Sequence, residues 1–268
     1  MSGVGGSSTG PAPSYAVTMN VQVVLVHGIR TSRTMWRAQM EHLAGRDVPA
    51  VAVDLPGHGS RMDETFTLGA AFATIDEAVQ EAASRGPVLL AGHSMGGLVS
   101  VAYAGSEAAP PVSAFIGASC TAFPRGAGLA TYRTLARAFD ALPDRGMWLT
   151  ERVLAATIPE ETRPDFAAGG YALDTQDAAL ASLGALDLAA DLTRLTMPVW
   201  WINGQFDQLR MQERLFRRLT PHSELIVVPR TSHLVTAMRP RVFNALLDVA
   251  IATLHRSEAS QEPARRSS

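Results

Sequence analysis

The chain has 268 residues and is 47% hydrophobic, which suits one sizeable core, with or without an inserted lid, rather than two independent domains. Its formal net charge is −2 without any basic block, so neither nucleic acid nor another polyanion is an expected partner. All 23 basic residues are arginines, and the absence of lysine excludes Schiff-base chemistry and pyridoxal phosphate attachment.

Both ends of the chain have the composition of flexible tails. Residues 1–17 are rich in Gly, Ser and Pro, and residues 256–268 are similarly polar. The first twenty residues lack the basic start and apolar run of a secretory signal, and no apolar stretch reaches transmembrane length. The single cysteine, Cys120, cannot form an internal disulfide. We therefore expect a cytoplasmic protein with no membrane partner, and the Ala, Arg and Gly bias is typical of a GC-rich bacterium.

Between the tails, short apolar runs alternate with helical patterns. Six runs are apolar almost throughout, as parallel strands covered on both faces are: 21–26, 49–53, 87–91, 112–117, 198–203 and 224–228. The expected core helices are 35–44, 68–84, 96–107, 210–219 and 239–255. This alternation predicts an α/β fold with a doubly wound, mostly parallel sheet of about six core strands.

The alternation of strands and helices is interrupted between the expected strands at 112–117 and 198–203. The connection between them is longer than one crossover helix needs. Residues 121–185 resemble several short helices separated by Pro and Gly breakers. We expect them to form a helical cap inserted into a core made of residues 18–120 and 186–255. The large apolar residues of the cap are candidates for a substrate pocket, although each also fits the cap's own core: Phe123, Phe139, Met147, Trp148, Phe166 and Tyr171. Of these, Phe123 and Trp148 are the predicted substrate-binding residues.

A Gly-x-Ser-x-Gly pentad, with Gly92, Ser94 and Gly96 as its fixed positions, follows the apolar run at 87–91 and precedes the helix expected from 96. Strand, pentad and helix in this order predict a nucleophile elbow, a tight turn that exposes the serine hydroxyl above the sheet. Gly flanks the serine because a side chain there would collide with the neighbouring strand or helix. The pentad alone is a weak signal, so supporting residues are needed.

Two further residues would complete the chemistry of a nucleophilic serine. Asp207 follows the strand at 198–203, and His233 follows the strand at 224–228, at the carboxyl ends where α/β sheets place their sites. His233 would take the proton of Ser94, and Asp207 would orient the imidazole. The alternatives are a helix-capping role for Asp207 and a solvent-exposed loop position for His233.

The developing oxyanion needs backbone donors. The amide of Met95, directly after the serine, is one candidate, and the amide of Ile29, after the first strand, is the other. Gly28 would let that loop pass close to the site, and His27 is expected to brace it rather than act as a second base. Arg30 is a candidate for binding a carboxylate or enolate of the substrate, and its alternative is an exposed loop position.

Several segments together resemble the α/β-hydrolase superfamily, in its cap-bearing branch: VVLVHG (23–28), VDLPGHG (53–59), VLLAGHSMGG (88–97), TMPVWWINGQFD (196–207) and TSH (231–233). The resemblance implies Ser94 as nucleophile, Asp207 as acid and His233 as base, with Ile29 and Met95 as oxyanion donors. It departs from the family at the start, where the residues that often form an additional hairpin are tail-like here.

These observations predict a serine hydrolase that cleaves a carboxylic ester, lactone or thioester of a small, largely apolar substrate through an acyl-enzyme on Ser94. No metal and no organic cofactor is expected, and the oligomeric state is open between monomer and homodimer. Three alternatives use the same fold: hydrolysis of a carbon–carbon bond, a lyase or cyclase step in natural-product biosynthesis, and a non-enzymatic receptor for a small ligand.

Overall fold

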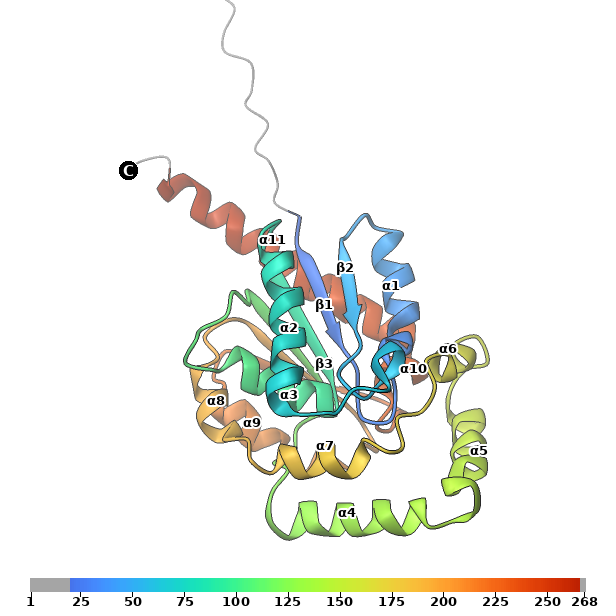
Figure 1. Cartoon of the computed structure of the whole chain (residues 1–268). Coiled ribbons are helices and arrows are strands. Elements are labelled where there is room, and N and C mark those ends of the chain that lie inside the picture. The colour runs from blue at the N-terminus through green and yellow to red at the C-terminus, as the bar shows by residue number, and fades with distance from the viewer. Residues whose placement is uncertain (1–19, 266–268) are drawn as a thin grey trace, which may run out of the picture.

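The computed structural model describes residues 20–265, in which six parallel strands form one sheet in the order β2-β1-β3-β4-β5-β6 (Figure 1). The strands are Gln22–Val26 (β1), Ala50–Val53 (β2), Val88–His93 (β3), Ala114–Ala118 (β4), Val199–Gly204 (β5) and Ser223–Val228 (β6). Each overlaps a strand expected from the sequence. The sheet and its surrounding helices confirm the predicted fold class.

The helices that cover the sheet are α1 (Arg37–Ala44), α2 (Leu68–Ala83), α3 (Met95–Ala104), α8 (Leu188–Arg194), α9 (Glu213–Leu219), α10 (Val235–Met238) and α11 (Pro240–Arg265). Single 3₁₀ turns occupy Arg33–Trp36, Gly59–Arg61 and Pro143–Gly146. The helix predicted to end at 255 continues to Arg265, which corrects the tail predicted from 256, because Ala, Glu and Gln extend a helix that has already formed. The tail predicted at 1–17 and residues 266–268 lie outside the described residues.

Burial along the strands follows their place in the sheet. The inner strands β1, β3, β4 and β5 are buried at every position, whereas the edge strands β2 and β6 are partly exposed. Helices α2, α3, α8 and α9 pack on one face, and α1 and α11 pack on the other. Covering both faces in this way explains why the inner strands are continuous apolar runs in the sequence rather than alternating ones.

Four helices lie between β4 and β5: α4 (Gly126–Asp140), α5 (Met147–Thr157), α6 (Arg163–Ala167) and α7 (Gln176–Leu183). Figure 1 shows α4, α5 and α7 beyond the carboxyl ends of the strands, at the bottom of the view. Helix α4 is an amphipathic surface helix in which no residue is fully buried, so its apolar side faces a space rather than a packed core. That space is the pocket described below.

Candidate active site

Ser94 lies at the turn between β3 and α3. Its backbone has φ 52° and ψ −119°, a conformation that residues other than glycine rarely adopt. The turn is tight on both sides. A Cβ at Gly96 would lie 2.2 Å from the His27 carbonyl oxygen, and one at Gly92 would lie 2.6 Å from the Cα of Gly97. Glycine is therefore required at both positions, and the local geometry is that of a nucleophile elbow.

The structure brings the three predicted side chains into one hydrogen-bonded chain. His233 Nε2 lies 2.9 Å from Ser94 Oγ, and His233 Nδ1 lies 3.0 Å from Asp207 Oδ1. The Asp207 carboxylate only accepts hydrogen bonds, so the Nδ1 proton of His233 faces it. Nε2 then has a free lone pair, which accepts the hydroxyl proton of Ser94. The arrangement can deprotonate Ser94 without any rearrangement of the protein.

Asp207 is held as a carboxylate by its surroundings. Its side chain is completely buried, and its Oδ1 also accepts the backbone N–H of Leu209 at 2.8 Å. Burial alone raises the pKa of Asp207, but the hydrogen bond from His233, together with the Leu209 amide and the nearby Ser119 hydroxyl, brings the pKa below its usual value. Helix α9 begins at Glu213, so Asp207 is not the helix cap considered as its alternative.

Sequence reasoning did not single out Ser119, a buried polar residue whose hydroxyl helps to lower the pKa of Asp207. Ser119 directly follows β4, the strand next to β5, and its backbone has a φ of 53°. The signal that would have found it is a polar residue at the carboxyl end of the strand adjacent to the one that precedes Asp207.

His93 connects the elbow to the loop that carries His233. Its Nε2 lies 2.9 Å from the backbone oxygen of His233, and the two rings are 5.1 Å apart. Burial, with a smaller contribution from the charge of His233, lowers the pKa of His93 to about 3, so its ring is neutral and Nε2 donates to that oxygen. The contact holds the His233 loop against the elbow, a role that the sequence did not reveal.

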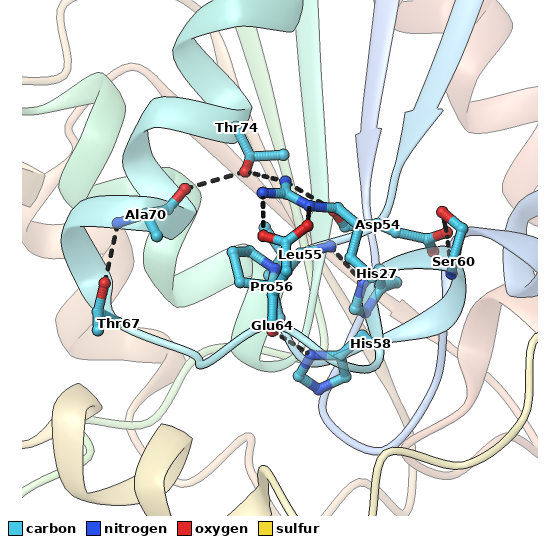
Figure 2. A network of polar contacts seen from close by, with 11 residues as sticks. His27, Asp54, Leu55, Pro56, His58, Ser60, Glu64, Thr67, Ala70 and Thr74 are labelled. Carbon is cyan, nitrogen blue, oxygen red and sulfur yellow. Dashed lines mark hydrogen bonds and ion pairs between the residues drawn. The ribbon is translucent and has the colours of Figure 1, made fainter.

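His27 braces the loop after β1, as expected. Its Nε2 accepts the Leu55 amide at 3.0 Å, and its Nδ1 donates to the Gly28 carbonyl at 2.7 Å. Figure 2 shows this ring beside the Asp54 carboxylate, which accepts the backbone amide and the hydroxyl of Ser60. Burial and the neighbouring His58 lower the pKa of His27 to about 3. The network fixes the loop that leads to the predicted oxyanion donor.

Both residues predicted as oxyanion donors flank Ser94. Met95 is the first residue of α3, so the helix itself provides no acceptor for its amide. A Cβ at Gly28 would lie 3.3 Å from the Ser94 Cβ, which shows how closely the loop carrying Ile29 passes the serine. Ile29 itself lines the pocket.

Ser94 and His233 open into a pocket of about 670 Å³ between the ends of the strands and the inserted helices. That volume suits a small organic molecule. Among the apolar residues proposed from the sequence, three contribute to its wall: Phe139, Phe166 and Tyr171. Among the residues that the structure describes, no group of three or more His, Cys, Asp or Glu side chains is arranged to hold a metal ion, and no helix is long and apolar enough to cross a membrane.

Two predicted substrate-binding residues lie outside this pocket, which corrects the prediction. Leu149 and Val153, one helical turn apart on α5, face the pocket, so Trp148 points away from it and is 47% exposed. Phe123 packs against the core instead, with its ring 5.0 Å from that of Phe216. The apolar character of a residue does not by itself show which side of a short helix faces the pocket.

Arg30, the third predicted substrate-binding residue, lines the pocket. Its backbone lies in the left-handed region, with a φ of 63°. The guanidinium carbon lies 5.5 Å from the centre of the Phe139 ring, and Nη2 lies 3.7 Å from a carboxylate oxygen of Asp140. Both neighbours come from the C-terminal turn of α4, so Arg30 contacts the inserted helices from the core side.

The sequence from residue 23 to 246 matches the model of the alpha/beta hydrolase family. The chain therefore belongs to the alpha/beta hydrolase family, as its resemblance predicted. A sequence comparison with curated proteins gives no match.

Solved structures show the same fold at low sequence identity. A thermophilic esterase from Thermogutta terrifontis is 23% identical, with 88% of this chain and 91% of that chain covered and a TM-score of 0.70. A bromoperoxidase from Bacillus anthracis is 20% identical, with 87% and 92% covered and a TM-score of 0.71. A thioesterase domain from the curacin biosynthetic pathway is 20% identical, with 87% and 92% covered and a TM-score of 0.64. Family and neighbours together support a hydrolase, and such likeness does not identify its substrate.

Proposed function

We propose that this protein is a serine hydrolase that cleaves a carboxylic ester, thioester or lactone of a small substrate through an acyl-enzyme on Ser94. The observation that carries the proposal is the continuous hydrogen-bonded chain from Ser94 through His233 to Asp207. Ser94, at one end of these hydrogen bonds, lies on a strained turn and faces a pocket large enough for a small substrate. An activated serine at such a position is suited to acyl transfer.

In the proposed reaction, Ser94 Oγ attacks the substrate carbonyl while His233 Nε2 takes the hydroxyl proton. The negative charge that develops on the carbonyl oxygen is stabilised by the amides of Ile29 and Met95. The bond to the leaving group then breaks, and His233 returns the proton to that group. A water molecule, deprotonated by His233, attacks the acyl-enzyme, and the acid product leaves as the proton returns to Ser94. Asp207 stabilises the imidazolium in both halves of the reaction.

The inserted residues 121–185 act as a cap in this proposal. They supply pocket-lining side chains from α4 and α5, opposite the elbow. The wall is largely apolar, so it excludes water from the site of attack and favours a substrate with a small apolar body. The substrate is the only partner that the mechanism requires.

The test is a panel of p-nitrophenyl esters, acyl thioesters and lactones, assayed with the wild-type chain and Ser94→Ala. We expect Ser94→Ala to lower kcat by about a thousandfold or more, because the nucleophile is lost. Ser100→Ala is the matched control: Ser100 is a buried serine of α3 that does not line the pocket, and this variant is expected to retain activity within about twofold.

A trapped adduct tests the intermediate itself. Rapid quenching during turnover of a p-nitrophenyl ester should add the mass of the acyl group to the peptide that contains Ser94. Near wild-type rates in Ser94→Ala, or no turnover of any panel member by the wild-type chain, would contradict the proposed function.

A further inference from the structure

In the part of the chain that the structure describes, the residues that line the pocket include a positively charged side chain but no negatively charged one. Within the described residues, the wall contains no Asp or Glu, and Arg30 is its single arginine. Most of the remaining wall is apolar or aromatic, with neutral polar side chains such as Thr150 and Gln176. A permanently charged group in such surroundings favours an anion over a neutral or cationic ligand.

The guanidinium of Arg30 has an ion-pair partner in Asp140 and a ring partner in Phe139, but it has no hydrogen-bond acceptor among residues 20–265. Among the described residues it makes no hydrogen bond, and its Nη2 is buried without one. The carboxylate of Asp140 is 3.7 Å away, beyond hydrogen-bonding distance, and its nearer oxygen is likewise buried without a hydrogen bond. Arg145 also pairs with Asp140, at 3.5 Å, so the negative charge of Asp140 is shared. Donors left unpaired in this way are costly unless a ligand uses them.

The backbone holds Arg30 in this place. Its positive φ is a strained conformation for a residue other than glycine. Arg30 follows Ile29 directly, so a group bound by its side chain lies in the same pocket as the reacting carbonyl. The guanidinium also contacts the Phe139 ring, 5.5 Å from its centre, and this contact uses no N–H donor of the guanidinium.

We propose that the substrate carries a carboxylate in addition to the bond that is cleaved, and that Arg30 binds this carboxylate inside the pocket. The inference rests on the proposed function, because it names the substrate class of the same site. A carboxylate accepts two parallel N–H bonds from a guanidinium, which satisfies the donors that the protein leaves unpaired. Arg30 therefore selects half-esters or half-thioesters of dicarboxylic acids over neutral esters of equal length.

The competing explanation is that Arg30 only ties its loop to α4 through Asp140. The two explanations differ in what Asp140→Asn does. If Arg30 binds substrate, Asp140 competes with the substrate carboxylate, and Asp140→Asn lowers KM for a carboxylated substrate by about two- to fivefold. If the pair is only structural, Asp140→Asn and Arg30→Met impair all substrates to the same extent.

The experiment compares p-nitrophenyl half-esters of succinate, glutarate, adipate and suberate with neutral p-nitrophenyl esters of matching length. The wild-type chain is expected to prefer its best half-ester by at least tenfold in kcat/KM. Arg30→Met should lower kcat/KM at least tenfold on that half-ester and less than threefold on the neutral ester. Arg152→Met, which removes an exposed charge from the outer side of α5, is the matched control and should change neither value. No preference in the wild-type chain, or equal losses on both substrates, would overturn the proposal.

A binding measurement separates this inference from the proposed function. Glutarate is titrated by calorimetry into Ser94→Ala, and neutral glutaramide is titrated alongside. Saturable binding of glutarate that Arg30→Met weakens at least tenfold supports the carboxylate site, even if no ester is cleaved. Absence of glutarate binding, together with ester turnover that depends on Ser94, would overturn the carboxylate site and leave the hydrolase intact.

Discussion

Replacing Gly96 by alanine tests how tightly the elbow is built. The added Cβ would lie 2.2 Å from the His27 carbonyl oxygen and 2.7 Å from that of Val26, and both atoms belong to the backbone at the end of β1. An ordinary contact needs about 1 Å more, which only a shift of β1 against α3 can provide. Overpacking a core costs about 1–3 kcal/mol of stability. Gly96→Ala should cost about the upper limit or more, because the atoms in the way belong to the backbone and no flexible side chain can move aside.

Gly69→Ala is the matched control, because the same methyl group enters open space there. Gly69 lies in the first turn of α2, where a Cβ would meet nothing within 4 Å. Alanine at this position is expected to stabilise the chain by up to about 1 kcal/mol, through its higher helix propensity and the lower entropy of the unfolded chain. The two Gly→Ala variants should therefore shift stability in opposite directions.

Urea unfolding followed by tryptophan fluorescence measures both shifts. With an m-value of about 3 kcal/mol/M, Gly96→Ala should lower the unfolding midpoint by about 1 M, and Gly69→Ala should raise it by up to about 0.3 M. Gly96→Ala should also lose esterase activity, because the loop carrying Ile29 must move. A midpoint for Gly96→Ala within 0.2 M of the wild-type value, with full activity, would refute the argument from close approach.

Two further predictions follow from the hydrogen bonds and charges of the site. His27 and His93 have a pKa of about 3 in the folded chain against 6.5 when exposed, so only the unfolded chain binds these protons between those pH values. Each histidine should lower the free energy of unfolding by about 1.4 kcal/mol for each pH unit below 6.5 and should have no effect above that pH. Urea unfolding midpoints measured from pH 7 to 5 test this. His93→Gln should make the dependence of stability on pH less steep, and an unchanged slope would count against a neutral buried His93 ring. Asp207→Asn should lower kcat by about 10³–10⁴-fold, because the imidazole of His233 loses the partner that fixes its tautomer. A loss of less than tenfold in steady-state assays would exclude Asp207 as the acid.

Features that depend on local backbone chemistry were predictable from the order of residues along the chain. Inner strands covered on both faces are apolar at nearly every position, so they were recognisable as continuous runs. The elbow requires glycine at positions 92 and 96 because backbone atoms occupy the space of a side chain. The order of these signals also placed Ser94, Asp207 and His233 at the same edge of the sheet, since parallel strands end together.

Contacts between side chains of different elements could be identified only once the fold was known. Nothing local to Trp148 shows that it faces away from the pocket, because the direction of a short helix relative to the core is set by its packing. The approach of Asp140 to Arg30 and the contact of His93 with the His233 backbone likewise join segments far apart in the chain. Such contacts depend on how whole helices and loops are positioned over the sheet, and a sequence pattern records only the period of each element.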